Sequence, residues 1–87
     1  MACYIISIDM PAGAEIARVV EAIKSYGTWA HIAHTTWAVV SDKDHKQIRD
    51  HISTCVPEAV RIFVVKSGKT AAWRNVICRN EWLKENL

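Results

Sequence analysis

The stretch MACYIISID at residues 1–9 is apolar and β-branched, which predicts a largely buried β-strand. A single carboxylate, Asp9, ends this stretch, and Met10 and Pro11 follow it at once. An unpaired carboxylate costs several kcal/mol to bury, so Asp9 should lie at the margin of the sheet, where it can meet a cation or solvent. Asp9 is therefore the first candidate site residue.

Helical and strand patterns alternate after this strand. A turn is expected at Pro11–Gly13, and apolar residues then recur at helical spacing over residues 16–23, with Gly27 expected to end that helix. Residues 28–40 are rich in Trp, Ile, Thr and Val. They predict two strands joined by a hairpin at residues 33–35.

The second half of the chain repeats the pattern and adds a tail. Ser41 or Asp42 is expected to cap a second helix, with an apolar stripe over residues 48–56 and its end at Pro57. Residues 61–66 predict a fourth strand. In the tail, Trp73, Val76 and Ile77 stand at helical spacing, and a last turn or two is expected at residues 80–87.

This order predicts an α+β fold, the ferredoxin-like βαββαβ sandwich, with a four-stranded antiparallel sheet and two helices on one face. Residues 1–66 would form that core, and residues 67–87 a C-terminal extension that packs on the same domain or on a dimer partner. If Tyr4, Ile6 and Ile8 face the helices, strand alternation turns a second set to the open face. That set is Cys3, Ile5, Ser7, Asp9, Arg61, Phe63 and Val65.

Composition describes one small domain of 87 residues, 51% hydrophobic and 23% charged. One core of this size is marginal, and four tryptophans favour burial against a second copy, so a homodimer is expected. No apolar run approaches the roughly 18 residues of a membrane span, and no secretion signal is recognisable, so we expect a cytoplasmic protein without membrane contact. Cys3, Cys55 and Cys78 are widely spaced, which predicts buried reduced thiols.

Charge is unevenly distributed along the chain. Residues 1–65 carry six Lys and Arg against seven Asp and Glu, a net charge of −1, whereas residues 66–87 carry five against two, a net charge of +3. A basic tail indicates an anionic partner. Trp73 beside Arg74 combines an indole with a guanidinium, which can stack on and neutralise a nucleotide, and Lys69 and Arg79 are further phosphate partners by type.

Two other motifs resemble ligand-binding motifs, but we do not expect either to form the site that it resembles. Residues 67–70, Ser-Gly-Lys-Thr, match the tail of a Walker phosphate loop, but Phe63 stands where that motif needs its first glycine, so we expect a strand-exit turn. His31 and His34 have a two-histidine spacing. On a strand, residues three apart face opposite sides, so we expect no shared zinc ion.

Four stretches of the chain resemble the small bacterial proteins labelled SinR-like: Tyr4–Asp9, Ala22–Trp29 with His31 and Thr36-Trp37, Arg61–Lys66, and Glu81–Leu87. Those proteins more distantly resemble the small CRISPR adaptation endoribonuclease and the virulence-associated protein D ribonucleases. The resemblance implies a ferredoxin-like homodimer. It also implies that Asp9 matches an aspartate that meets its dimer mate and holds a divalent ion for phosphodiester hydrolysis.

We therefore predict a homodimer that binds a nucleotide or nucleic acid near the subunit interface, with little or no catalysis. The predicted ligand-binding residues are Ser7, Asp9, Trp29, His31, Arg74 and Arg79. One alternative is an endonuclease or phosphodiesterase that depends on Mg²⁺ or Mn²⁺, with Asp9 as metal ligand and catalytic residue. Another is a scaffold module whose open sheet face and tail meet another protein.

Overall fold

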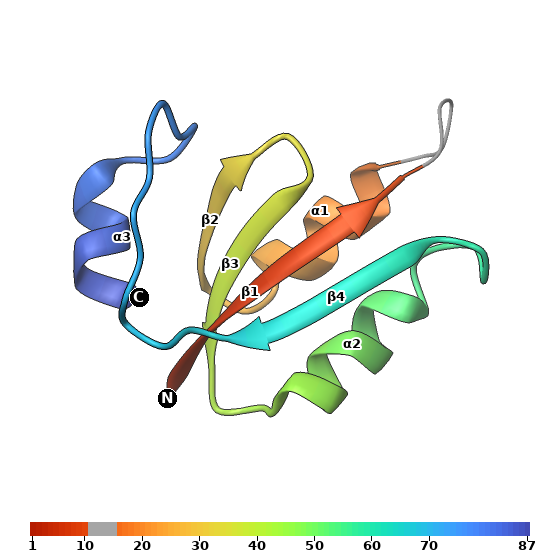
Figure 1. The fold of residues 1–87 in the computed structure, drawn as a ribbon. Helices are drawn as coiled ribbons and strands as arrows, with labels where there is room; N and C mark the ends of the chain where they lie inside the picture. Colours follow the sequence, from red (N-terminus) through yellow and green to blue (C-terminus); the bar gives the residue numbers. More distant parts are fainter. Residues whose placement is uncertain (11–15) are drawn as a thin grey trace.

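The computed structural model describes residues 1–10 and 16–87 and shows an α+β fold (Figure 1). The elements in chain order are β1 (Ala2–Asp9), α1 (Ala17–Lys24), β2 (Thr28–Ala33), β3 (Thr36–Ser41), α2 (His45–Ser53), β4 (Arg61–Lys66) and α3 (Asn80–Asn86). The turn predicted at Pro11–Gly13 lies outside the described residues. No helix in the described part of the chain has the length and apolar content that a membrane crossing requires.

The four strands form one antiparallel sheet in the order β2-β3-β1-β4, which confirms the predicted sheet. The apolar strand β1 lies between β3 and β4, and Ile6 faces Trp37 on one side and Val64 on the other. The hairpin between β2 and β3 and the bounds of β4 are as predicted. The two edges of the sheet are therefore β2 and β4.

The core lies between one face of the sheet and helices α1 and α2, which lie behind the sheet in Figure 1. Tyr4, Ile6 and Ile8 face this layer, so the predicted alternation of β1 is confirmed. The other members of the core cluster come from α1, β3 and α2: Val19, Ile23, Trp37, Val39, Ile48 and Ile52. Burial of these side chains supplies the main driving force for folding.

The ends of the helices differ in part from the prediction. Gly27 adopts a φ of +86° in the turn that follows α1, a conformation that glycine reaches at little cost. The predicted caps of α2 are wrong, because Ser41 still belongs to β3 and the helix begins after Asp44. Asp44 Oδ1 accepts from the Gln47 N–H at 2.9 Å, and Gln47 Oε1 accepts from the Asp44 N–H at 2.9 Å. This reciprocal capping box determines where α2 starts.

The tail, residues 67–87, follows a path that local spacing did not predict. The helix expected around Trp73–Ile77 is wrong, and the only tail helix among the described residues is α3. Instead, the Ile77 N–H donates to the Ile32 carbonyl at 2.9 Å, so the tail runs along the edge of β2. Leu83 of α3 is only 1% exposed and anchors the tail on its own domain.

Candidate functional site

A pocket of about 350 Å³ lies along the outer edge of β2, where the tail meets the sheet. We call it the aromatic pocket, and its lining residues are Trp29, Ala30, His31, Ile77, Cys78, Arg79 and Trp82. Three of the six predicted ligand residues, Trp29, His31 and Arg79, converge there from two segments that are far apart in sequence. Its volume falls within the range of small-molecule binding sites.

The strand side of the pocket is held by packing against the core. The ring of His31 stacks on Trp37 with a centroid distance of 4.4 Å and an angle of 6° between the planes. These two residues are cross-strand partners in the β2–β3 ladder, so their rings lie on the same face of the sheet. Trp29 packs against the core cluster, and Lys24 Nζ lies 5.2 Å from the centre of its ring. Both strand residues are therefore restrained before any ligand binds.

The tail side of the pocket combines apolar surface with one cation. Ile77 is positioned by its hydrogen bond to Ile32, next to a break in the β2 register between His31 and Ala33. Burial raises the pKa of the Cys78 thiol, so at neutral pH this side chain is protonated and weakly polar. The side chain of Arg79 is 86% exposed, and its Nε lies 3.8 Å from a Glu81 carboxylate oxygen. An ion pair of that length in solvent leaves the guanidinium accessible to an anion.

Ser7 and Asp9, two other predicted ligand residues, do not line the aromatic pocket. Arg61 Nη1 donates to Asp9 Oδ2 at 3.1 Å, and both side chains are mostly exposed. The predicted position of Asp9 at a sheet margin beside a cation is thus confirmed. Two strand spacings, roughly 10 Å, separate β1 from β2, so Ser7 and Asp9 form a separate polar group on the sheet.

The remaining predicted groups lie outside the aromatic pocket. Trp73 is half-buried, and its Nε1–H donates to Asn80 Oδ1 at 3.1 Å, which ties the tail to the start of α3. Arg74 is exposed and lies outside the aromatic pocket. Lys69 has a φ of 70°, and its N–H donates to Ser67 Oγ at 3.4 Å, a tight turn at the exit of β4 as predicted.

Thiols and other metal-ligating side chains are dispersed in the described part of the chain. All three cysteines are free, with Cys3 buried and Cys55 and Cys78 partly buried. Residues 1–10 and 16–87 contain no group of three or more His, Cys, Asp or Glu placed to hold a metal ion. His31 Nε2 lies 3.3 Å from the backbone carbonyl oxygen of His34, so this histidine interacts with the hairpin backbone.

Sequence reasoning missed Trp82, Ile77 and Cys78 as lining residues of this pocket. Trp82 was one of four tryptophans that each had a plausible packing role, and nothing in the local sequence singled it out. Its contribution depends on α3 folding back against β2, a long-range contact. The excess of basic residues in the tail was the one sequence signal that pointed to this part of the chain as a binding region.

Comparison of the chain with protein-family models, with curated proteins and with solved structures finds no match. The resemblance to SinR-like proteins therefore stays a prediction from the quoted residues.

Proposed function

We propose that this protein binds a nucleotide or a short single-stranded nucleic acid in the aromatic pocket, on a ferredoxin-like βαββαβ scaffold and with little or no catalysis. The observation that carries the proposal is the convergence of Trp29, Trp82 and Arg79 on one pocket at the edge of β2. Two indoles and a guanidinium supply the two interactions that a nucleotide needs, one for its base and one for its phosphate.

The base is the part of the ligand that fits the apolar lining. A nucleobase has two flat faces that stack on indole rings, and each such contact is worth roughly 1 to 3 kcal/mol. Trp29 and Trp82 are both half-buried, so each combines a packed side with surface that lines the pocket. Because Trp29 is already restrained by the core, little conformational entropy is lost when a base stacks on it.

The phosphate is the part of the ligand that fits the guanidinium of Arg79. Arg79 is the one basic side chain in the lining of the aromatic pocket, and it is accessible and only weakly paired with Glu81. The tail as a whole carries a net charge of +3, but the chain carries only +2. A long polyanion typically recruits a denser basic surface, so this modest charge favours a ligand with few phosphates.

The metal-dependent nuclease alternative has less support. Phosphodiester hydrolysis with Mg²⁺ or Mn²⁺ usually needs two or more carboxylates around the ion. Asp9 is engaged by Arg61, and the described residues place no second acidic side chain in a three-ligand group with it. A cation that already neutralises the carboxylate competes with a metal ion for the same oxygen.

The test is a titration of the purified protein with nucleoside monophosphates, cyclic dinucleotides and short single-stranded RNA and DNA, followed by calorimetry and tryptophan fluorescence. We expect Trp82→Ala to weaken binding by about 5- to 150-fold, the equivalent of one lost stacking contact. Arg79→Ala should weaken binding and reduce its salt dependence. Arg49→Ala is the matched control, because it removes the same charge from α2, away from the pocket.

Binding that is unaffected by both Trp82→Ala and Arg79→Ala would show that the ligand sits elsewhere. If none of these compounds produces heat, quenching or a change in melting temperature, the scaffold alternative replaces this proposal. In that case the open sheet face and the tail become the surfaces to test against protein partners.

A further inference from the structure

The outer edge of β4 presents backbone groups that β1 does not use. The Ser67 N–H donates to the Cys3 carbonyl at 2.8 Å, which makes Cys3 and Ser67 a hydrogen-bonded pair of the ladder. Such pairs alternate along an antiparallel ladder, so odd-numbered residues of β4 bond to β1 and even-numbered ones point outward. The outward N–H and C=O groups belong to Ile62, Val64 and Lys66.

This edge has few of the features that usually prevent pairing, because its two charged residues, Arg61 and Lys66, stand only at its ends. The segment 61–66 contains no proline or glycine, and its register with β1 runs without a bulge. The opposite edge differs, because β2 has an irregular register after His31 and the tail covers it through the bond from Ile77 to Ile32. An edge strand that is straight, apolar at its centre and not covered by residues 1–10 or 16–87 is a template for pairing with another strand.

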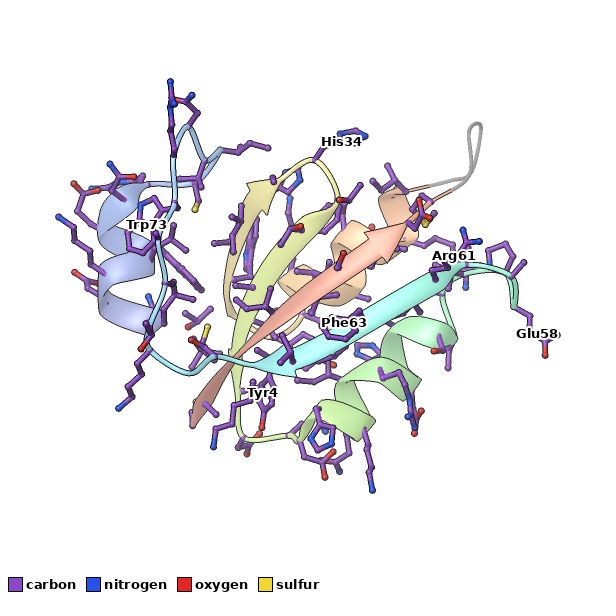
Figure 2. All side chains as sticks on the ribbon, in the orientation of Figure 1. Tyr4, His34, Glu58, Arg61, Phe63 and Trp73 are labelled. Atoms are coloured by element: carbon purple, nitrogen blue, oxygen red, sulfur yellow. The ribbon has the colours of Figure 1, made fainter. Side chains whose placement is uncertain are left out.

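Side chains next to the β4 edge are also unusually exposed for their type. Phe63 is 63% exposed and Val65 is 42% exposed, and both project from the face of the sheet opposite to α1 and α2. Figure 2 shows Phe63 on the open face, in front of the strands. Aromatic and β-branched side chains favour each other as cross-strand neighbours, so a second strand at this edge could cover both.

The charges at the two ends of β4 have opposite signs. Glu58 lies just before the strand, beyond Arg61 in Figure 2, and Asp9 is paired with Arg61, so this end carries a net charge of −1. Lys66 and Lys69 at the other end carry +2. An antiparallel arrangement of two copies places the acidic end of one strand against the basic end of the other, whereas a parallel arrangement would bring like ends together.

We propose that β4 pairs antiparallel with β4 of a second copy, around a two-fold axis at Val64, so that the two sheets become one. This register pairs all three outward-facing residues, because Val64 faces its own copy and Ile62 faces Lys66 of the partner subunit. Phe63 then lies opposite Val65 of the partner subunit on the open face. The occupant of this edge is therefore a second copy of this chain.

The proposal goes beyond the ligand proposal and does not depend on it. The aromatic pockets lie at the β2 edges and so stay accessible at the two ends of the joined sheet. The two Asp9 side chains are separated by three strand spacings and by several residues along the strands, roughly 25 Å in all. This dimer therefore cannot place the two carboxylates around one metal ion.

The test is the molar mass of the purified protein by light scattering and sedimentation over a range of concentrations. We expect the mass of two chains for the wild type. Val64→Pro removes an outward N–H and leaves the ladder with β1 intact, and Phe63→Lys changes a side chain that is already exposed. Each should raise the dissociation constant of the dimer at least about tenfold, with unchanged circular dichroism.

A charge exchange makes the test specific for the antiparallel register. In this register Glu58 of one copy lies nearest Lys69 of the partner subunit, so Glu58→Lys and Lys69→Glu should each weaken the dimer, and the double variant should restore it toward the wild-type constant. If Val64→Pro fails to fold, Phe63→Lys and the charge exchange decide the question. A wild type with the mass of one chain at every concentration overturns the proposal, as does a dimer that Phe63→Lys leaves unchanged.

Discussion

The two edge strands of the sheet, β2 and β4, both have backbone groups that face away from the sheet. The tail covers those of β2 and leaves those of β4 open. At β2 the register breaks after His31, the Ile77 N–H bonds to the Ile32 carbonyl, and the tail folds over the edge. At β4 the strand is regular, and Phe63 stays 63% exposed beside it. A small sheet has to protect its edges from uncontrolled pairing, and within residues 1–10 and 16–87 the chain covers the β2 edge but not the β4 edge.

This difference separates two roles that share one small domain. Covering the β2 edge brings Trp82 and Arg79 from the tail to Trp29 on the strand, and the aromatic pocket forms between them. Leaving the β4 edge open provides the surface at which we propose that a second copy pairs. Because the two edges are separated by three strand spacings, about 14 Å, a change at one edge should leave the other largely unaffected.

Leu83→Ala is expected to have the largest effect, because Leu83 is 1% exposed and anchors α3 at the covered edge. Removing a fully buried leucine side chain typically lowers the free energy of unfolding by about 2 to 5 kcal/mol. Phe63→Ala at the open edge is the matched variant, and in the isolated chain it should cost about 1 kcal/mol or less. Urea denaturation monitored by tryptophan fluorescence measures both values, and equal losses would contradict the comparison.

The core elements were predictable because their signals are local. The bounds of β4, the hairpin between β2 and β3 and the faces of Tyr4, Ile6 and Ile8 all follow from the period and the residue types of short segments. The cap of α2 was missed because Ser41 and Asp42 have suitable side chains, and only the Asp44–Gln47 pair distinguishes the true start. Reciprocal bonding, rather than residue type alone, determines such a cap.

The site was predictable only in part, because it depends on contacts between distant segments. Trp29, His31 and Arg79 were chosen by residue type, and the fold brings them together. Ser7 and Asp9 were chosen by the same logic but lie on a different part of the sheet. What separates the two groups is the path of the tail, which Ile77 and Leu83 set through contacts that no local spacing encodes.

His31→Ala should give the next largest effect at the covered edge. Its ring stacks on Trp37, and such an aromatic pair contributes about 0.5 to 1.5 kcal/mol beyond its burial. We expect a loss of stability in this range and weaker nucleotide binding, because a wall of the pocket is removed. His34→Ala, in the exposed hairpin, is the matched control and should change neither property. Equal effects of the two variants would remove the stacking explanation.

Helix α2 packs beneath the open β4 edge, and its contribution to stability should decrease in acid. Ile48 and Ile52 of α2 pack in the core cluster against which Val64 of β4 rests, and α2 starts at Asp44. The backbone hydrogen bond from Gln47 lowers the pKa of Asp44 below its ordinary value. This stabilisation is therefore present above the unfolded pKa of about 3.9 and is lost as the pH falls through the lower folded value.

Asp44→Asn separates this titration from the cap itself, because an asparagine still accepts the Gln47 N–H but carries no titrating group. At neutral pH the wild type should be the more stable protein, and the difference in melting temperature should shrink on acidification below about pH 4. Thermal unfolding followed by circular dichroism at several pH values measures this difference. A gap between the two melting temperatures that does not change with pH would contradict the assigned role of the Asp44 carboxylate.

Asp9→Asn should have the smallest effect on both edges. The Asp9–Arg61 pair is solvent-exposed, and such pairs contribute about 0 to 1 kcal/mol, so unfolding should change little. Nucleotide affinity should also be unchanged, because Asp9 does not line the aromatic pocket. The decisive measurement is incubation with RNA and DNA in the presence of Mg²⁺ or Mn²⁺. If the wild type yields metal-dependent products and Asp9→Asn does not, the chemistry belongs to the Asp9–Arg61 end of the sheet, and the covered edge then serves at most to hold the substrate.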